Sequence, residues 1–292
     1  MQIFTQAEKA EACNFHTVFQ PDHTVLMGGP IPEAWTLLGA LAIKTKTVKL
    51  CTAVSDTHRN HPAIMAQKVA TLDQISNGRA MLGLGVGEAM NCDRLGIPRT
   101  PSMKKLREYI EVVRLLWRKR RVKYSGKYFQ LKKGCIDIKP IKNHIPIYIA
   151  ANGPKMCELT GEIGDGWLPA YMSPKLFAER RKYVENGIKK SEEPEKKLET
   201  FDFGLFTFTL ISDDHQAIMK KLQYLKIAYC SIPNNINAAY NLDIPKDLHF
   251  ALSEKEPDQD LMNKIPDRAI EELNIIGTVD ECIAQIERFQ KA

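Results

Sequence analysis

The stretch that decides the fold is HPAIMAQKVATLDQISNGRAMLGLGVGEAMN, residues 61–91. Its first half carries apolar residues at helical spacing from Pro62 to Ile75, and proline fits the first turn of a helix because its missing N–H has no partner there. The tripeptide SNG (76–78) then ends the helix, since asparagine and glycine tolerate a left-handed backbone after the last turn. The apolar run 80–84 predicts a buried strand. A helix followed by a buried strand is the repeating unit of a parallel α/β sheet.

The same alternation continues in both directions along the chain. Apolar, β-branched runs predict strands at 16–20, 47–54, 80–84, 146–150, 203–211 and 227–232. Apolar residues at helical spacing predict helices at 5–14, 32–44, 62–75, 102–119, 154–163, 174–190, 214–224 and 279–290. The strands are almost continuously apolar, which is typical of strands covered on both faces. The order predicts an α/β fold, either an open doubly wound sheet or a closed barrel.

Three segments break the alternation. Residues 121–138 predict a small antiparallel excursion, and the charged residues 191–199 predict a solvated loop. Residues 233–268 have weak periodicity and predict a mostly helical insertion or lid. Because there is neither a fixed repeat nor a long linker, we expect a single domain over 1–292 with insertions near 121–138 and 233–268.

Composition excludes several classes of protein. The 41 basic and 35 acidic residues give a net charge of +6 without a long basic run, so we expect no nucleic-acid partner. No apolar run approaches the roughly 18 residues that span a bilayer, and the N-terminal residues are polar, so we expect no membrane partner and a cytoplasmic protein. Seven cysteines without a CxxC pair predict reduced thiols, and no metal site is expected.

Polar residues gather where the predicted strands end. In parallel α/β folds chemistry takes place at the carboxyl ends of the strands. The exits are Asp22-His23, Ser55-Asp56, the glycine-rich run 83–91 and residues 151–154. The glycines of 83–91 are spaced two apart, which does not match the GxGxxG dinucleotide motif. They either let a flat ligand lie close to the backbone or simply form a tight turn.

Two titratable residues at these exits are candidates for acid/base chemistry. Taken singly, His23 fits a surface or core residue beside a helix-capping Asp22, and Glu88 fits an acid favoured at a helix N-terminus. Both nevertheless lie on the predicted active face, where an imidazole and a carboxylate form a workable acid/base pair. By contrast, we expect Arg59 and its histidine neighbours to form a structural loop, and Arg79 to face the opposite end of the sheet.

Several segments, in the right order along the chain, resemble the bacterial-luciferase-like superfamily and, within it, the branch that uses coenzyme F420, a deazaflavin. They are FHTVFQPDH (15–23), TAVSD (52–56), the stretch 61–91, IPIYIAANGPKMCELTGEIGDGW (145–167) and IIGTVDECIAQIE (275–287). The resemblance implies a (β/α)8 TIM barrel. The usual first and last strands of that barrel have no counterpart here, because the sequence opens in a helix and stops after the helix at 279–290.

The resemblance also implies the site. His23 and Glu88 fall where the dehydrogenase members place their catalytic acid/base pair, and a non-proline cis peptide behind the cofactor would join Ala53 and Val54. The residues implied to line the deazaflavin are Asp22, Ala53, Val54, Asp56, Val86, Gly87, Asn91, Asn152 and Gly153.

The function expected from this resemblance is a coenzyme F420-dependent oxidoreductase. It would transfer a hydride between the deazaflavin and a small-molecule substrate, an alcohol, carbonyl or pterin-type compound, and act as a homodimer. Two alternatives stay open: an FMN-dependent luciferase-like monooxygenase, and a non-catalytic cofactor-binding or structural relative. Glucose 6-phosphate is disfavoured as the substrate, because the resemblance implies that the phosphate-binding lysine of the sugar-phosphate enzymes would fall near Pro174.

Overall fold

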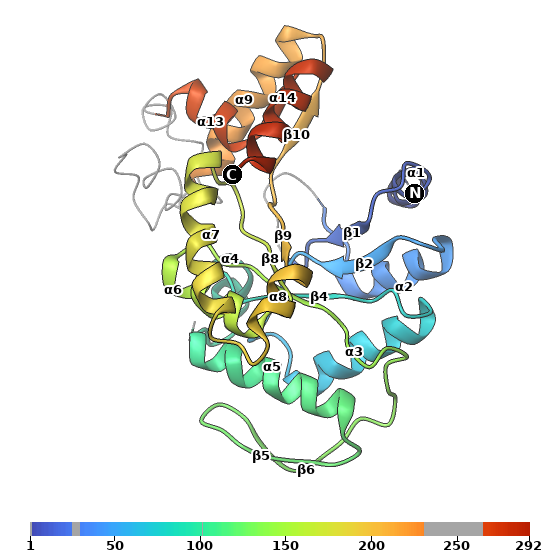
Figure 1. Ribbon diagram of the computed structural model, residues 1–292. Helices are drawn as coiled ribbons and strands as arrows, with labels where there is room; N and C mark the ends of the chain where they lie inside the picture. Colours follow the sequence, from blue (N-terminus) through green and yellow to red (C-terminus); the bar gives the residue numbers. More distant parts are fainter. Residues whose placement is uncertain (1, 25–29, 101, 231–264) are drawn as a thin grey trace. The chain divides into compact units, whose positions relative to one another are not determined.

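The computed structural model describes residues 2–24, 30–100, 102–230 and 265–292 (Figure 1). The chain divides into two compact units, which are described separately. The first consists of Met1–Ala150, Ile163–Gly166 and Glu199–Phe201, and the second of Ala151–Glu162, Trp167–Leu198 and Asp202–Ala292. The insertion predicted at 233–268 lies outside the described residues except for its last four.

The first unit alternates helices and strands, as predicted. Its helices are α1 (Gln2–Ala12), α2 (Ala34–Lys44), α3 (Pro62–Ile75), α4 (Ala89–Cys92) and α5 (Met103–Arg118), with a 3-10 turn η1 (Asp93–Leu95). Its main strands are β1 (Thr17–Gln20), β2 (Lys49–Thr52), β3 (Ser55–Asp56), β4 (Leu82–Gly85) and β7 (Ile147–Ile149). The helix α3 has the bounds that its sequence predicts.

The main strands of the first unit run parallel. β1 pairs with β2, β3 with β4, and β4 with β7. A parallel bridge between Leu50 and Ala80 links β2 to the residues before β4. The expectation of strands covered on both faces is confirmed for β2, β4 and β7, whereas the residues of β1 are only partly buried. The fully buried side chains are those of Leu50, Cys51, Leu82, Leu84, Ile147 and Ile149.

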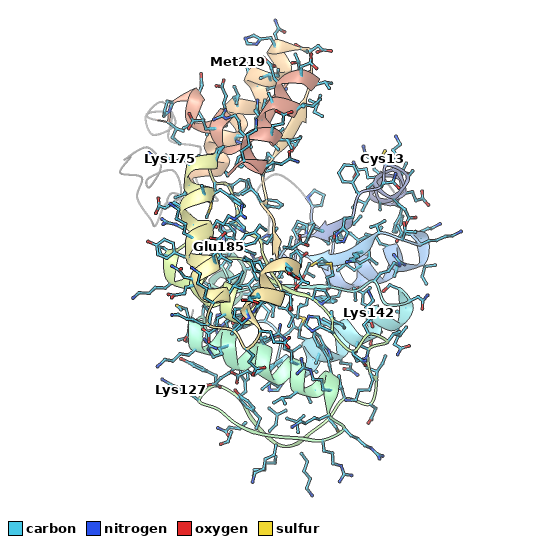
Figure 2. All side chains as sticks on the ribbon, viewed as in Figure 1. Cys13, Lys127, Lys142, Lys175, Glu185 and Met219 are labelled. Atoms are coloured by element: carbon cyan, nitrogen blue, oxygen red, sulfur yellow. The ribbon has the colours of Figure 1, made fainter. Side chains whose placement is uncertain are left out.

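The antiparallel excursion is confirmed as the hairpin of β5 (Val122–Ser125) and β6 (Gln130–Gly134). Glu108 of α5 holds its turn, because the carboxylate accepts hydrogen bonds from the backbone N–H groups of Lys127, Tyr128 and Phe129. Lys127 is labelled in Figure 2, and its Nζ lies over the neighbouring Tyr128 ring, 5.5 Å from the ring centroid.

Arg79 lies just before β4, at the amino end of the strand. Its guanidinium donates to the carbonyl oxygens of Ser76, Val48, Ala42 and Thr45 at 2.8–2.9 Å. These bonds tie the ends of α2 and α3 to the start of β4, so Arg79 has the structural role that was expected.

The second unit carries all or part of each remaining element, since Ile163, Gly166 and residues 199–200 belong to the first unit. Its helices are α6 (Pro154–Ile163), α7 (Pro174–Ile188), α8 (Pro194–Thr200), α9 (His215–Cys230), α13 (Asp267–Leu273) and α14 (Val279–Gln290). Its strands are β8 (Gly166–Trp167), β9 (Asp202–Phe203), β10 (Thr209–Ile211) and β11 (Ile275–Gly277), of which β10 and β11 pair in parallel. A capping box of Thr278 and Glu281 begins α14.

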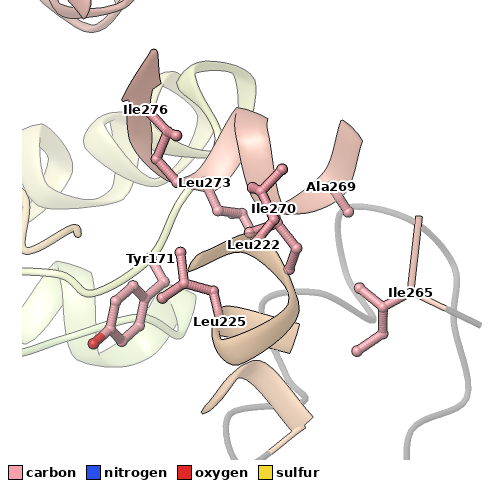
Figure 3. Packing of buried hydrophobic residues seen from close by; sticks show 8 residues of the cluster. All are labelled: Tyr171, Leu222, Leu225, Ile265, Ala269, Ile270, Leu273 and Ile276. Atoms are coloured by element: carbon pink, nitrogen blue, oxygen red, sulfur yellow. The ribbon is translucent and has the colours of Figure 1, made fainter. Parts of the chain in front are cut away.

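A hydrophobic cluster joins α9, α13 and β11 in this unit (Figure 3). Leu222 and Leu225 of α9 pack there with Ile270 and Leu273 of α13. The strand predicted at 227–232 is therefore wrong: residues up to Cys230 continue α9, because packing at helical spacing outweighs the β-branched and aromatic composition of the segment. Residues 231–232 lie outside the described part of the chain.

Two further expectations need correction. The segment 191–199 is not only a loop, since α8 begins at Pro194, where proline suits a first turn. The strand predicted at 203–211 is two short strands, β9 and β10. Between them Phe206 makes only an isolated bridge to Ala170, and the Thr207 hydroxyl donates to the Leu273 carbonyl oxygen at 2.6 Å.

Glu11 at the end of α1 supplies a test of the first unit's acid stability. Its carboxylate accepts hydrogen bonds from the backbone N–H groups of Lys46, Thr47 and Val48 at 2.6–3.0 Å. Burial raises the pKa of Glu11, but these donors outweigh it and lower the pKa from 4.5 to about 2. A carboxyl group with a lowered pKa in the folded state stabilises the fold fully above pH 4.5, and loses that contribution as the pH falls towards 2.

Because these hydrogen bonds lie mostly at the surface, where solvent screens them, we expect Glu11→Gln to lower the free energy of unfolding at pH 7 by only about 1 kcal/mol. The difference from wild type should shrink between pH 4.5 and about 2. Urea denaturation at a series of pH values measures it, with Glu8→Gln on the same helix as the control. A pH-independent difference would contradict the expectation.

Candidate active site

The chain after β1 is held by a buried carboxylate. Asp22 is 6% exposed, and its side chain accepts a hydrogen bond from the Ser55 hydroxyl. One carboxylate oxygen also lies 3.1 Å from Nη1 of Arg59, whose guanidinium donates in addition to the Asp22 carbonyl oxygen. Asp22 thus anchors the segment that carries His23.

A bulge separates β2 from β3. The Ala53–Val54 peptide bond is cis, as the family resemblance implied. Thr52 and Ser55 on either side are fully buried, whereas Ala53 and Val54 are half-buried. The bulge is therefore the part of this strand that faces accessible space.

The glycines of β4 make room for this bulge. A Cβ added at Gly83 would lie 1.9 Å from the Thr52 carbonyl oxygen, and one added at Gly85 would lie 3.0 Å from the Val54 side chain. Packing within the protein therefore accounts for both glycines, and no ligand is needed to explain them.

Asp56 ends β3 and begins a tight turn. Its Oδ1 accepts hydrogen bonds from the backbone N–H groups of His58 and Arg59, at 2.7 and 2.8 Å. Arg59 Nε pairs with the other oxygen. Burial by itself raises the pKa of Asp56, but the hydrogen bonds and charge of Arg59 hold it below its ordinary value. Asp56 is therefore a carboxylate at neutral pH.

The loop after β4 is held by a hydrogen bond from the His58 ring to the Val86 carbonyl oxygen. His58 Nδ1 lies 2.8 Å from Lys105 Nζ, which can only donate, so the ring's Nε2–H donates to the Val86 carbonyl oxygen at 2.9 Å. Burial and the charge of Lys105 lower the pKa of His58, so this histidine is neutral. Gly87 follows with φ +88°, and a Cβ there would lie 2.6 Å from the His58 ring, so glycine is required on both counts.

The structure brings the predicted acid/base pair together. His23 Nδ1 lies 3.6 Å from Glu88 Oε2, with side-chain exposures of 16% and 60%. Glu88 directly precedes α4 but makes no capping hydrogen bond, so its carboxylate does not bind the N–H groups at the start of the helix. Asn91 lies between the two side chains, with Nδ2 2.6 Å from His23 Nδ1 and 3.4 Å from Glu88 Oε2.

Two predicted cofactor residues, Asn152 and Gly153, belong to the second unit, just before α6. The Asn152 side-chain oxygen accepts a hydrogen bond from Ala170 N at 3.1 Å, and its backbone oxygen accepts one from Arg180 Nε. No atom lies within 4 Å of a Cβ added at Gly153, in contrast to the other glycines of the site, and the φ of Gly153 is not positive. Neither backbone nor packing requires glycine at 153.

Arg59 is the site residue that sequence reasoning missed. It was expected to be part of a structural loop, yet it pairs with both Asp22 and Asp56 and is only 11% exposed. The available signal was its position, three residues after an aspartate at a strand exit, where two carboxylates predicted to converge need a counter-ion.

Two classes of site are absent from what the structure describes. In residues 2–24, 30–100, 102–230 and 265–292, no three His, Cys, Asp or Glu side chains lie close enough to hold a metal ion. Within the same ranges, every helix is too short or too polar to cross a bilayer.

Curated relatives of this chain are named for different substrates. It is 30% identical to a 5,10-methylenetetrahydromethanopterin reductase from Archaeoglobus fulgidus, over 89% of this chain and 79% of that protein. It is 32% identical to an F420-dependent glucose-6-phosphate dehydrogenase from Microbacterium testaceum, over 96% of this chain and 81% of that protein.

A solved structure is also similar to this chain. An F420-dependent secondary alcohol dehydrogenase, in complex with an F420–acetone adduct, matches with a TM-score of 0.81 and 26% identity, over all of this chain and 86% of that one. This likeness confirms the predicted fold class, a (β/α)8 barrel of luciferase-like type. The sequence profile described as luciferase-like monooxygenase matches residues 2–292, nearly the whole sequence, so this chain belongs to the luciferase-like monooxygenase family.

Proposed function

We propose that this protein is a coenzyme F420-dependent oxidoreductase that transfers a hydride between the deazaflavin and a small organic substrate. The observation that carries the proposal is the His23–Glu88 pair, held 3.6 Å apart after β1 and β4. The relatives add support, because two of them with different substrates are named as F420-dependent. The substrate class is an alcohol or carbonyl compound, or a pterin-type compound.

The residues present fit a flat cofactor. Ala53 and Val54 remain half-buried between fully buried neighbours, so a ring has a surface to rest on there. The open space beside Gly153 is the second sign, because glycine there is explained by neither packing nor backbone conformation. We propose that the cofactor ring rests against Ala53 and Val54, and that the lining set comprises Asp22, Ala53, Val54, Asp56, Val86, Gly87, Asn91, Asn152 and Gly153.

When bound, the deazaflavin supplies the hydride acceptor or donor at its C5 carbon. The protein's own residues handle the proton. Oxidation of an alcohol removes a hydride from carbon and a proton from the hydroxyl group, and the proton passes to the His23–Glu88 pair; reduction of a carbonyl runs in reverse. Asp22, fixed by Arg59, holds the backbone beside His23.

We further propose a cytoplasmic homodimer. Ile3, Phe15 and Ile43 are exposed apolar side chains on and beside α1 and α2, as a surface shared between copies requires. The described cysteines are free, as in a reducing compartment, and Cys13 stands on the surface (Figure 2). The expectation of a single domain over 1–292 stays a prediction.

Titration of the purified protein with F420 and, separately, with FMN tests the cofactor. Quenching of ligand fluorescence reports binding, and we expect F420 to bind with micromolar affinity. Binding of FMN alone would overturn the proposal in favour of an FMN-dependent monooxygenase. Binding of neither cofactor would favour a non-catalytic relative.

Gly153→Ala tests the proposed contact in the second unit. The added methyl group occupies the open space that we assign to the cofactor, so the affinity for F420 should fall at least about tenfold, or ~1.4 kcal/mol. The matched control is Gly39→Ala in α2, where a Cβ also meets no atom within 4 Å; it should leave F420 affinity unchanged and raise stability by up to about 1 kcal/mol. Equal F420 affinity in both variants would contradict the assignment.

A further inference from the structure

The orientation of the Asn91 amide is fixed by its neighbours. Asn91 is only 3% exposed, and its Oδ1 accepts hydrogen bonds from the backbone N–H of Thr24 at 2.8 Å and from the Thr24 hydroxyl at 3.2 Å. On the other side, Nδ2 lies 3.4 Å from Glu88 Oε2, and a carboxylate only accepts. A flipped amide would turn its NH2 group towards the Thr24 N–H and its oxygen towards the carboxylate, and both contacts would be repulsive.

This orientation decides which nitrogen of His23 carries the proton. The Asn91 NH2 group lies 2.6 Å from His23 Nδ1, so Nδ1 is the acceptor. In a neutral imidazole the other nitrogen, Nε2, then bears the hydrogen. Asn91 cannot offer Nδ1 an acceptor instead without giving up the Thr24 backbone N–H.

We propose that Asn91 is a positioning residue that holds His23 as the neutral Nε2–H tautomer, so that the ring gives the substrate oxygen an N–H donor, and that the substrate is a carbonyl compound. The assignment of substrate rests on the proposed function; the tautomer does not. This tautomer gives the two residues of the His23–Glu88 pair different roles. His23 is the hydrogen-bond donor, and Glu88 is the group that exchanges the proton.

The proposed step is the reduction of the substrate's carbonyl group. The carbonyl carbon receives a hydride, and the electron pair of the C=O π bond moves to the oxygen. His23 Nε2–H stabilises the negative charge that develops there, as a neutral imidazole does when it acts as an electrophile. The Glu88 carboxylate, 60% exposed to solvent, then relays one proton from water to the oxygen, and the hydroxide that remains is taken up by the solvent.

The tautomer is measurable by 15N NMR of histidine-labelled protein without cofactor, with the His23 signals assigned by their loss in His23→Gln. We expect Nδ1 of wild type to show the unprotonated signature and Nε2 the protonated one. Asn91→Asp replaces the donor by a carboxylate that only accepts, so the proton should move to Nδ1. Thr24→Val keeps the backbone N–H and should keep the wild-type tautomer. A protonated Nδ1 in neutral wild type, or an unchanged tautomer in Asn91→Asp, overturns the positioning role.

The second readout is turnover with reduced F420 and a panel of short ketones and aldehydes. Asn91→Asp should lower kcat by about 10²–10³-fold, the cost of losing one donor to a developing oxyanion. Asn77→Asp, at the other end of β4, adds the same charge and should stay within about twofold of wild type. Wild-type protein that binds F420 but reduces none of these compounds contradicts the carbonyl substrate. Failure to bind F420 instead refutes the proposed function and leaves the NMR result standing.

Discussion

Replacing His23 by alanine is expected to lower kcat by about 10²–10³-fold while the affinity for F420 stays within a few-fold of wild type. Acid/base or donor groups at a reacting oxygen contribute about this much to turnover. The His23 side chain is 16% exposed beside Glu88, so its loss removes a partly exposed group and not a core residue. Steady-state kinetics and F420 titration of the same preparation measure the two quantities.

Two variants separate the possible roles of His23. His23→Gln retains an N–H donor but no titratable group, so it should keep more activity than His23→Ala if the ring acts as a donor. Glu88→Gln removes the carboxylate and should lower kcat by about 10²-fold or more. If both His23→Ala and Glu88→Gln keep full activity on the true substrate, the assignment of the pair is wrong.

Local signals in the sequence sufficed for much of the fold. Pro62, the apolar spacing up to Ile75 and the SNG turn at 76–78 define α3 completely, and Asn77 and Gly78 have the left-handed backbone that this turn requires. The same kinds of signal failed at 227–230. There α9 continues because Leu222 and Leu225 pack on α13, a contact between segments that no local pattern contains.

The candidate site, like the fold, was predictable only in part. Strand order places His23 and Glu88 at one end of the sheet, and the structure brings them within 3.6 Å. The contacts of their neighbours were not predictable, because Asn91 and Arg59 act through hydrogen bonds to atoms far away in sequence. Arg59 bonds the Asp22 carbonyl oxygen, and Asn91 the Thr24 N–H. Such contacts depend on the register between β1, β3 and β4, which composition and periodicity do not specify.

Arg59→Met is expected to be the most destabilising of the substitutions considered. Asp22 and Asp56 are 8% and 7% exposed at their side chains, and Arg59 is the cation that both share. Removing one partner of a buried ion pair leaves uncompensated charge and costs about 3–5 kcal/mol, here with two carboxylates left behind. Urea denaturation at pH 7 measures the loss. Lys291→Met, which removes an exposed i,i+4 pair with Glu287, is the control and should change stability by less than about 0.5 kcal/mol.

The pH dependence of the free energy of unfolding shows whether this loss of stability is electrostatic. Arg59 holds the pKa of Asp56 below its ordinary value of 3.8, so the pair stabilises the fold above that pH and ceases to do so as the pH falls through the lowered pKa. The difference between wild type and Arg59→Met should therefore be largest at neutral pH and shrink in acid. Adding Asp22→Asn to Arg59→Met should restore part of the stability, because one buried charge disappears. A difference that is constant with pH and unaffected by Asp22→Asn would mean that Arg59 acts through packing alone, and that the charges of Asp22 and Asp56 do not need it.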